Sequence, residues 1–452
     1  ANSLRQNRAD SSFLSKTFSG DGTHHDKGTI SVWVKRSEIG AESMIYSAGA
    51  SGREFFRFET NDTLTFRSVA EGFHLNTNRV FRDVSAWYHF VLALDSTQGT
   101  ASNRIKIYVN GVQETSFATE TYPSQNMDHK ILSAELQRLG KDSEQNGPYA
   151  NCYYCEVVGI DGQQLAADQF GEFDSDSNIW KPKNVSGLTF GTNGFHLDFE
   201  DSSALGNDVS GNNNDFANTN FTAIDQSSDS CTNNFATMNP LDNYYAGGTF
   251  AEGNLQVVTR DTGYSYNTST FGVATGKWYW EVKYVNIAAG SGDRFMPGIA
   301  KSFTTSTVDH MGYRNTSWGY QSSGDVFNNN STTSSGYASY GVGDIIGIAM
   351  DLDNLKLYFS INGTFQNSAN PATGSNGITI TAPDAVASDI GFYFPALGDG
   401  NNNYSGTGQF NFGSPPYAIS SGNTDGNGYG NFEYAVPSSY YSLNTKNLSE
   451  FG

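Results

Sequence analysis

The residue types that carry most covalent catalysis in proteins are few and scattered in this chain of 452 residues. Its 7 His include one adjacent pair, His24-His25, in the turn-like segment GDGTHHDKG. Its 3 Cys are Cys152, Cys155 and Cys231, the last of which stands alone in an expected loop. The sequence contains no GxSxG nucleophile elbow, no Cys–His pairing, no P-loop and no GxGxxG fingerprint. These patterns predict neither nucleophilic catalysis nor a nucleotide site.

Cys152 and Cys155 flank two tyrosines in NCYYCEVVGI, a run with the composition of a strand. Positions three apart on a strand point to opposite faces, so these two thiols cannot easily bridge one another. With no second CxxC and no His nearby, we expect free thiols rather than a zinc site. A fold that does not depend on disulfides fits synthesis in the cytoplasm.

A calcium site is the metal hypothesis that the residues support best. Asp208, Asn212 and Asp215 belong to the run DVSGNNND, in which several hard oxygen ligands surround a glycine. The run lacks the EF-hand order and its distal Glu, and Asx turns explain it equally well. No other cofactor is expected.

Aromatic residues that could contact a ligand gather in one Gly-, Ser- and Asn-rich stretch. Tyr313, Trp318, Tyr320 and Phe327 lie there, and aromatic faces beside small polar residues suit a sugar or protein ligand. Arg294, in the loop AAGSGDRF, is a further candidate contact.

Two expected β-hairpins show how the chain positions such loops. The stretch 340–365, YGVGDIIGIAMDLDNLKLYFSINGTF, alternates apolar and polar residues around a DLDN turn and ends at Asn362-Gly363. An earlier stretch repeats the pattern, with strands at 87–94 and 105–109 before Asn110-Gly111. Asn-Gly favours a type I′ turn because both central residues need positive φ. We therefore expect a strand pair and a second reversal in each stretch.

Composition favours β-structure along the whole chain. There are 49 Gly, 25 Tyr and 31 Phe, and polar runs of Asn, Ser, Thr and Gly separate short apolar-aromatic runs. Only Ser133–Leu139 and Gly162–Phe170 could each hold a short helix. Because 452 residues exceed one core, we predict an all-β chain of two antiparallel, jelly-roll-like β-sandwich domains in tandem.

The formal net charge of −20 and the pI near 4.6 argue against binding nucleic acid or an anionic membrane. The acidic surface is interpreted first as a well-solvated exterior, and otherwise as suited to divalent cations or neutral sugars. No stretch of about 18 apolar residues exists, and the first residues, ANSLRQNRADSS, have no hydrophobic signal core. We expect neither membrane insertion nor export, and the start inside a first strand leaves room for a preceding attachment segment.

Five motifs occur together in the first part of the chain: TISVWVKRSEIG, MIYSAGASG, SAWYHFVLALDS, NRIKIYVNGVQ and EVVGIDGQQL. This combination resembles the laminin-G-like, concanavalin-A-like lectin/glucanase sandwich over residues 1–175. The resemblance implies a β-sandwich, and such domains often carry calcium.

Because the concanavalin-A-like class includes glycosidases, the resemblance also raises a catalytic hypothesis. A retaining glucanase needs two carboxylates about 5–5.5 Å apart, typically from a Glu-x-Asp-x-x-Glu strand. No such run exists, and Asp198 and Glu200, two apart on an expected strand, are separated by about 6.6–6.8 Å before side chains are placed. We therefore expect no catalytic residues and no enzyme activity.

Residues 240–415 resemble the SPRY fold through GKWYWEVKY, PGIAK, SWGYQSSGDVFNN, the 340–365 stretch, FYFPALGDG and QFNFG, in matching order. The resemblance implies a second bent sandwich and places Trp318 and Tyr320 on a core strand, which is the alternative to ligand contact. Between the two domains, residues 176–239 are expected to be an Asn-, Asp-, Ser- and Gly-rich connector with one or two strands that pack on the first domain. Residues 416–452 are expected to form a C-terminal extension.

The pairing of both domains with LAADQFGEFDSDSNIWKPK, TNNFATMNPLDNYY and SLNTKNL resembles a recurrent virion protein of tailed, often marine, phages, labelled tail fibre or structural protein. The resemblance implies a place on the virion surface, as fibre tip or capsid decoration, and adhesion to a host glycan or protein through loops. The partners would be other virion proteins and copies of this chain, as a homotrimer. A polysaccharide-degrading glycosidase and a structural protein without a ligand are the alternatives.

Overall fold

The computed structural model describes residues 2–144, 146–242, 247–264, 266–289, 294–301, 309–385, 390–400 and 403–452. The chain forms two compact units, unit 1 (Ala1–Thr232) and unit 2 (Asn233–Gly452). Across the described ranges nearly all regular structure is antiparallel β-sheet, with one short α-helix, α1 (Thr445–Phe451). None of the helices in these ranges is long and apolar enough to span a membrane. The predicted all-β class, with antiparallel β-sandwiches in tandem, is confirmed.

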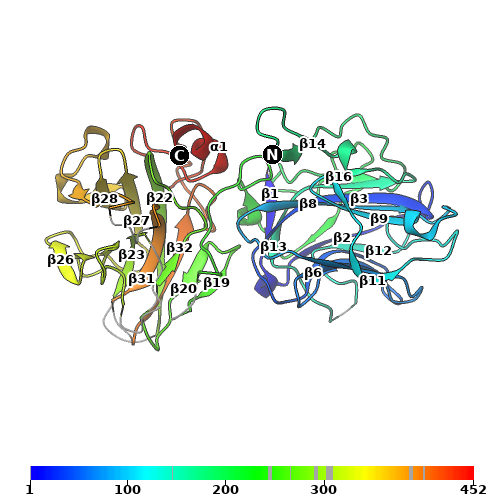
Figure 1. Ribbon diagram of the computed structural model, residues 1–452, viewed down its shortest axis with the longest axis horizontal. Coiled ribbons are helices and arrows are strands. Elements are labelled where there is room, and N and C mark those ends of the chain that lie inside the picture. Colours follow the sequence, from blue (N-terminus) through cyan, green and yellow to red (C-terminus); the bar gives the residue numbers. More distant parts are fainter. Residues whose placement is uncertain are drawn as a thin grey trace. The chain divides into compact units, whose positions relative to one another are not determined.

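Unit 1 is built from two eight-stranded sheets (Figure 1). In spatial order the first sheet contains β10 (Val112–Glu114), β9 (Ile105–Val109), β8 (Trp87–Asp95), β3 (Lys27–Arg36), β13 (Cys152–Asp161), β1 (Ser3–Gln6) and β18 (Gln226–Ser227), with β16 (Phe195–Leu197) paired to β13. The second sheet contains β11 (Phe117–Thr121), β7 (His74–Val80), β6 (Thr63–Ser68), β5 (Glu54–Phe58), β4 (Ser43–Ala48), β12 (Leu136–Leu139), β2 (Phe13–Thr17) and β17 (Ala217–Thr219).

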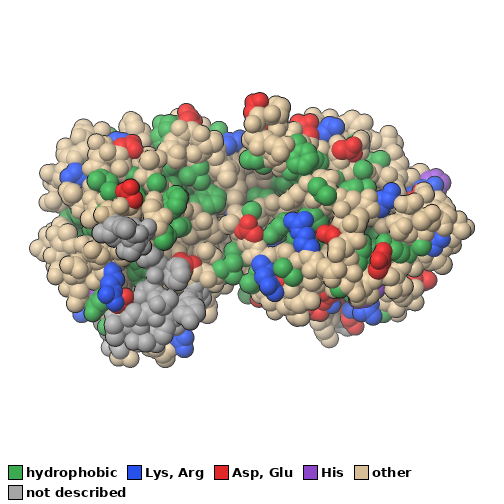
Figure 2. All heavy atoms as spheres, viewed as in Figure 1, with side chains coloured by type: hydrophobic (Ala, Val, Ile, Leu, Met, Phe, Trp, Pro, Cys, Tyr) green, Lys and Arg blue, Asp and Glu red, His purple; other side chains and the backbone are tan. Residues whose placement is uncertain are grey.

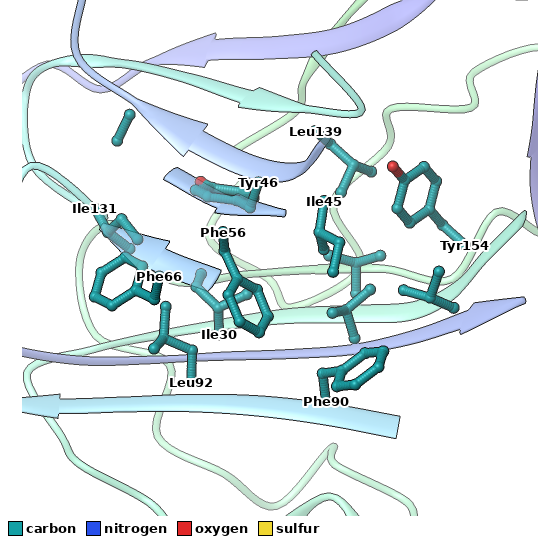
Figure 3. Close-up of a cluster of buried hydrophobic side chains, with 14 of the residues drawn as sticks. Ile30, Ile45, Tyr46, Phe56, Phe66, Phe90, Leu92, Ile131, Leu139 and Tyr154 are labelled. Carbon is teal, nitrogen blue, oxygen red and sulfur yellow. The ribbon is translucent and has the colours of Figure 1, made fainter. Parts of the chain in front are cut away.

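The core of unit 1 lies between these sheets. Along β3 the alternating residues Ile30, Val32 and Val34 face inward, because side chains two apart on a strand share a face. Figure 3 shows Phe56 and Phe90 reaching toward each other from opposite sheets, and their rings meet edge to face at 6.2 Å. Such a geometry is favoured because the positive ring edge meets the negative ring face.

Unit 2 also contains two sheets (Figure 1). The larger consists of β19 (Thr249–Ala251), β20 (Gln256–Val258), β32 (Ser405–Asn411), β22 (Lys277–Ala289), β27 (Ile345–Asp351), β28 (Lys356–Ile361) and β29 (Thr364–Phe365), with β30 (Ile378–Thr379) paired to β28. The smaller consists of β21 (Tyr266–Thr268), β31 (Phe394–Asp399), β23 (Phe295–Ala300), β24 (Ser317–Tyr320), β25 (Val326–Asn328) and β26 (Ser331–Ser334).

Both predicted hairpins and both Asn-Gly reversals are present. In unit 2, β27 pairs with β28, and Asn362 and Gly363 have φ of 48° and 80°. In unit 1, β8 pairs with β9, and the corresponding angles at Asn110 and Gly111 are 48° and 84°.

The asparagine of each reversal also makes a bond that the turn type does not require. The Asn110 Oδ1 accepts the backbone N–H of His89 at 2.7 Å, and the Asn362 Oδ1 accepts that of Ile345 at 2.9 Å. Aspartate would offer the same acceptor with a charge, and glycine none. The two units thus use the same hydrogen-bonding device to end a hairpin.

The expected boundary at residue 175 falls inside unit 1. The segment 176–232, expected to be mostly connector, supplies β15 (Trp180–Pro182), which pairs with β14 (Gly171–Phe173), and also β16, β17 and β18. Its apolar residues cover the outer face of the first sheet, where Val91 and Val158 pack with Val185. The outer face of the sheet needs this cover because its strands carry apolar residues on both sides.

The C-terminal extension belongs to unit 2, where it covers an apolar surface of the larger sheet. The Phe432 ring meets Tyr279 of β22 at 5.3 Å, and Tyr440 joins the same buried cluster. The stretch Ser133–Leu139 was a candidate for a short helix, but β12 occupies its second half. There Leu136 and Leu139 extend the second sheet between β2 and β4.

A buried carboxylate holds the C-terminal extension on its sheet. Glu281 of β22 is fully buried and accepts the backbone N–H groups of Tyr434 at 2.8 Å and Glu433 at 3.0 Å. The Asn411 amide donates to the same carboxylate at 3.1 Å. Burial raises the pKa of this carboxyl, and the donated hydrogen bonds oppose the rise. The carboxylate therefore replaces the water that these backbone groups lose on packing.

In unit 1 a buried histidine holds a covering segment on its sheet. Trp180 Nε1 donates to His89 Nδ1 at 3.0 Å, so Nδ1 carries no proton, and Nε2–H donates to Ser31 Oγ at 2.8 Å. The imidazole also stacks on Trp33, with ring centroids 4.6 Å apart. Burial lowers the pKa of His89 to about 3. The strand pair β14–β15 is thus held by a neutral imidazole.

We predict that Glu281→Ala lowers the free energy of unfolding by about 2–5 kcal/mol, because at least two buried backbone donors lose their acceptor. Chemical denaturation should show the loss, and limited proteolysis should cut faster within residues 416–434. Glu71→Ala, at an exposed turn of unit 1, is the matched control. Equal stability of Glu281→Ala and the parent would contradict the assigned role.

We predict that unit 1 becomes less stable as the pH falls, because His89 must stay unprotonated in the folded state. The folded pKa lies below the ordinary 6.5, so the unfolded chain binds a proton that the folded chain refuses. As the pH falls from 6.5 to about 3, His89 then lowers the free energy of unfolding by about 1.4 kcal/mol per pH unit. Urea unfolding of His89→Gln should show a shallower pH slope, whereas His24→Gln, at an exposed histidine, should follow the parent. Parallel slopes for His89→Gln and the parent would refute the assignment.

Candidate functional site

Two of the predicted ligand contacts are core residues. Trp318 and Tyr320 lie on β24 and are 2% and 0% exposed. Trp318 packs against Tyr393 at 5.7 Å, and the Tyr320 ring meets Phe359 at 5.2 Å. Their side chains cannot reach a ligand at the surface, so the structure favours the alternative interpretation of this strand.

The other two predicted aromatics lie together at the surface, in what we call the aromatic cluster: Tyr264, His310, Tyr313 and Phe327. All four side chains are half-buried. The His310 ring lies at the centre, 5.4 Å from Tyr264, 5.3 Å from Tyr313 and 6.3 Å from Phe327. Phe327 belongs to β25, while Tyr313 and His310 precede β24. The sheet therefore brings together rings that are up to 63 positions apart in sequence (264 to 327).

Tight turns fix the orientation of the cluster. The backbone N–H of Tyr313 donates to His310 at 2.9 Å, and that of Gly312 donates to Ser317 Oγ at 3.0 Å. Gly312 has φ of 80°, and a Cβ on it would lie 2.7 Å from Phe327 Cβ. Glycine is thus required where the loop passes beneath the ring. His310 Nδ1 bonds the carbonyl of Met311 at 2.8 Å, which leaves Nε2 of the ring for other contacts.

Charged and amide groups border the aromatic cluster. Arg314 Nε donates to Asp309 Oδ2 at 2.7 Å, and the guanidinium lies over the Tyr313 ring at 5.2 Å from its centroid. The Asn328 amide donates to the carbonyl of Ser317 at 2.9 Å. Rings bordered by fixed donors and acceptors can bind a ligand that has both C–H and hydroxyl groups.

Arg294 lies elsewhere on the same sheet. Its guanidinium donates to Gln321 Oε1 at 2.8 Å, just past the end of β24, whereas Tyr313 and Arg314 precede the start of that strand. Four residues of strand separate the two positions by about 13 Å. Sequence reasoning therefore grouped residues that the fold places at opposite ends of β24.

The predicted calcium run is held by hydrogen bonds among its own residues and to the neighbouring segment 191–196. Asp208 Oδ1 accepts the N–H groups of His196 and Ser210, and Oδ2 accepts those of Asn214 and the Ser210 hydroxyl. Asp215 accepts the N–H of Asp208, and the Asn212 amide donates to Gly191 and Gly194. In the part of the chain that the structure describes, no group of three or more His, Cys, Asp or Glu is arranged to hold a metal. This geometry supports the Asx-turn interpretation, and calcium stays a prediction.

A polar pocket of about 330 Å³ in unit 1 brings together side chains that the sequence separates. It is lined by Glu156, Lys183, His196, Asp198 and Glu200, among others. His196 Nε2 lies 2.7 Å from Glu156 Oε2. Glu156 sits in an irregularity of β13 with φ of 48°, a bulge that sequence periodicity cannot reveal.

Asp198 and Glu200 do not lie on a strand, which corrects the expectation. β16 ends at Leu197, and Phe199, between them, has φ of 58°. The alternation assumed for a strand therefore does not apply to these two carboxylates. Both nevertheless line the polar pocket.

The cysteines divide between the two faces of β13. Cys152 is buried in the core between the sheets, as expected for a free thiol. Cys231, expected to be alone, has its Sγ 2.8 Å from Sγ of Cys155. Because the two cysteines are 76 positions apart, the sequence alone does not indicate that they are close in space.

Comparison with known families agrees with the two sandwiches. Residues 12–158 match a laminin-G family model described as the concanavalin A-like lectin/glucanases superfamily, and residues 277–414 match the SPRY domain model. A solved structure of the SPRY domain of human HERC1 aligns with 16% identity and a TM-score of 0.30, over 38% of this chain and 96% of that one. No curated protein matches. The chain therefore carries a concanavalin A-like domain followed by a SPRY domain, a pairing that points to a binding or carbohydrate-related role.

Proposed function

We propose that this protein is a non-enzymatic adhesin, in which the aromatic cluster of unit 2 contacts a glycan or protein on a host-cell surface. The observation that carries the proposal is the arrangement of three half-buried rings around His310, bordered by Arg314 and Asp309. Rings held by rigid turns lose little conformational entropy on binding.

A carbohydrate is the ligand chemistry that this surface fits best. A pyranose ring offers a C–H face that packs on an aromatic side chain, and hydroxyls that need donors and acceptors at its edge. Arg314 and the Asn328–Asn330 turn provide such groups beside Tyr313. The formal net charge of −20 for the chain favours neutral over anionic glycans.

The proposed setting is the surface of a tailed-phage virion, as a fibre tip or a capsid decoration, after synthesis in the host cytoplasm. The sequence resemblance to such proteins supports this setting. We propose a homotrimer attached to other virion proteins, because several copies would turn weak single-site contacts, of mM order, into useful avidity. Light scattering of the purified chain, against 49.0 kDa for one copy, measures the number of subunits.

The polar pocket favours one alternative, a hydrolase that degrades a surface polysaccharide. Its carboxylates and the His196–Glu156 pair are residue types used in general acid–base catalysis. The missing Glu-x-Asp-x-x-Glu strand and the loop position of Asp198 and Glu200 weigh against it. A structural protein without a ligand is the remaining alternative.

We predict that Tyr313→Ala weakens glycan binding about 5- to 10-fold, because one stacking surface is removed from the aromatic cluster. A glycan array identifies the ligand, and titration calorimetry with that ligand measures the loss. Phe392→Ala, which removes an exposed ring outside the cluster, should bind like the parent. Equal affinity of the parent and Tyr313→Ala would exclude the cluster, and a blank array together with no host-cell binding would favour the structural alternative.

We predict that the purified protein releases no new reducing ends from host capsular or extracellular polysaccharide. The polar pocket lacks the paired-carboxylate strand of retaining glucanases. A colorimetric reducing-end assay checks this outcome. Release that is abolished in Glu156→Gln would overturn the non-enzymatic proposal in favour of the hydrolase.

A further inference from the structure

The thiols of Cys155 and Cys231 meet on the outer face of the first sheet of unit 1. Their Sγ atoms are 2.8 Å apart, closer than non-bonded sulfur atoms normally approach, and a disulfide bond requires about 2.0 Å. Cys152 lies on the other face of β13, inside the core, and cannot reach either of them without unfolding the sheet. The fold therefore selects one pair among the three cysteines.

The chain just before Cys231 is already fixed to the sheet. Asp229 is 1% exposed, and it accepts from Lys35 Nζ at 2.8 Å and Trp87 Nε1 at 3.2 Å. β18, just before it, pairs with β1. Because these contacts hold the backbone of Cys231 near β13, the two sulfur atoms stay in reach without a large conformational change.

We propose that Cys155 and Cys231 are a site of covalent modification, at which a small-molecule disulfide of the glutathione class oxidises the pair to an intramolecular disulfide bond. Cys155 is fully buried and Cys231 is half-buried, so the oxidant meets Cys231 first. This inference does not depend on the adhesin proposal.

The reaction is balanced by two exchange steps. The Cys231 thiolate attacks one sulfur of oxidised glutathione, forms a mixed disulfide and releases one glutathione thiolate. The Cys155 thiolate then attacks Sγ of Cys231, forms the intramolecular disulfide bond and releases the second glutathione thiolate. Two protein thiols are oxidised, one glutathione disulfide is reduced to two thiols, and the two protons pass to the released thiolates.

The bond would close a loop of 76 residues that includes β14 to β18 and the cover of the outer sheet face. Cross-linking a loop of this length reduces the conformational freedom of the unfolded chain, so the disulfide should stabilise unit 1. It would fasten to β13 the segment that follows β18, one residue before unit 1 ends at Thr232.

The test oxidises the purified full chain with excess oxidised glutathione at pH 8.5, where thiolate forms more readily. We expect the free thiols, counted after unfolding, to fall from three to one, and the melting temperature to rise by about 5–10 °C. A reducing agent should reverse both changes. Chymotrypsin cleaves after Tyr153 and Tyr154, so mass spectrometry of its digest distinguishes Cys155 from Cys152 in the linked peptide.

Three variants make the outcome decisive. Cys152→Ala should keep the linked peptide and the melting shift, whereas Cys231→Ser and Cys155→Ala should lose both. If either of the last two fails to fold, the thiol count and digest of the Cys152→Ala variant decide alone. A link to Cys152, glutathione left on Cys231 without a cross-link, or three thiols after oxidation would overturn the proposal, as would a cross-link without a rise in melting temperature.

Discussion

Irregular chain that packs against a sheet buries backbone N–H groups, and each of them needs an acceptor. In this protein buried carboxylates supply many of these acceptors. Glu281 receives the C-terminal extension, and Asp425 receives the N–H groups of Asn427, Tyr429 and Ser442. In unit 1 Asp161 receives those of Thr23 and Asn193. Without these carboxylates, the segments that seal the outer sheet faces would bury unpaired donors at about 1–3 kcal/mol each.

This constraint changes how the acidic composition is interpreted. Part of the excess of Asp and Glu lies inside the units, where it holds loops and is not available to cations. Asp208 is the clearest case, because both of its carboxylate oxygens accept hydrogen bonds from Ser210 in its own loop. On the face shown in Figure 2, the charged side chains of both signs are scattered rather than gathered into one patch. A ligand surface in unit 2 is therefore sought among aromatic rings rather than among charges.

The sequence predicted the parts of the fold that local rules control. Asn110-Gly111 and Asn362-Gly363 signal their turns through positive φ, and alternation identifies the inward residues of β3 and β27. Strands that pack on the first domain were expected within residues 176–239, but the apolar contacts of the cover could not be predicted, because they are spread through polar loops. Only part of the aromatic cluster could be predicted. Tyr313 and Phe327 lie in one stretch of the sequence, whereas Tyr264 comes close to them through the pairing of distant strands. The Glu156–His196 and Cys155–Cys231 contacts depend wholly on such long-range pairing.

The position of β1 has a consequence for the order of events during synthesis. Residues 3–6 emerge long before their neighbours, because they lie between β13 and β18, which are made from residues 152–161 and 226–227. At about 5–20 residues per second, the first strand waits about 10–45 s for its second neighbour. Through that interval its backbone edge has no native partner on that side, and such an edge can pair with other nascent chains. Chaperones that shield nascent strands would therefore influence the yield of this protein.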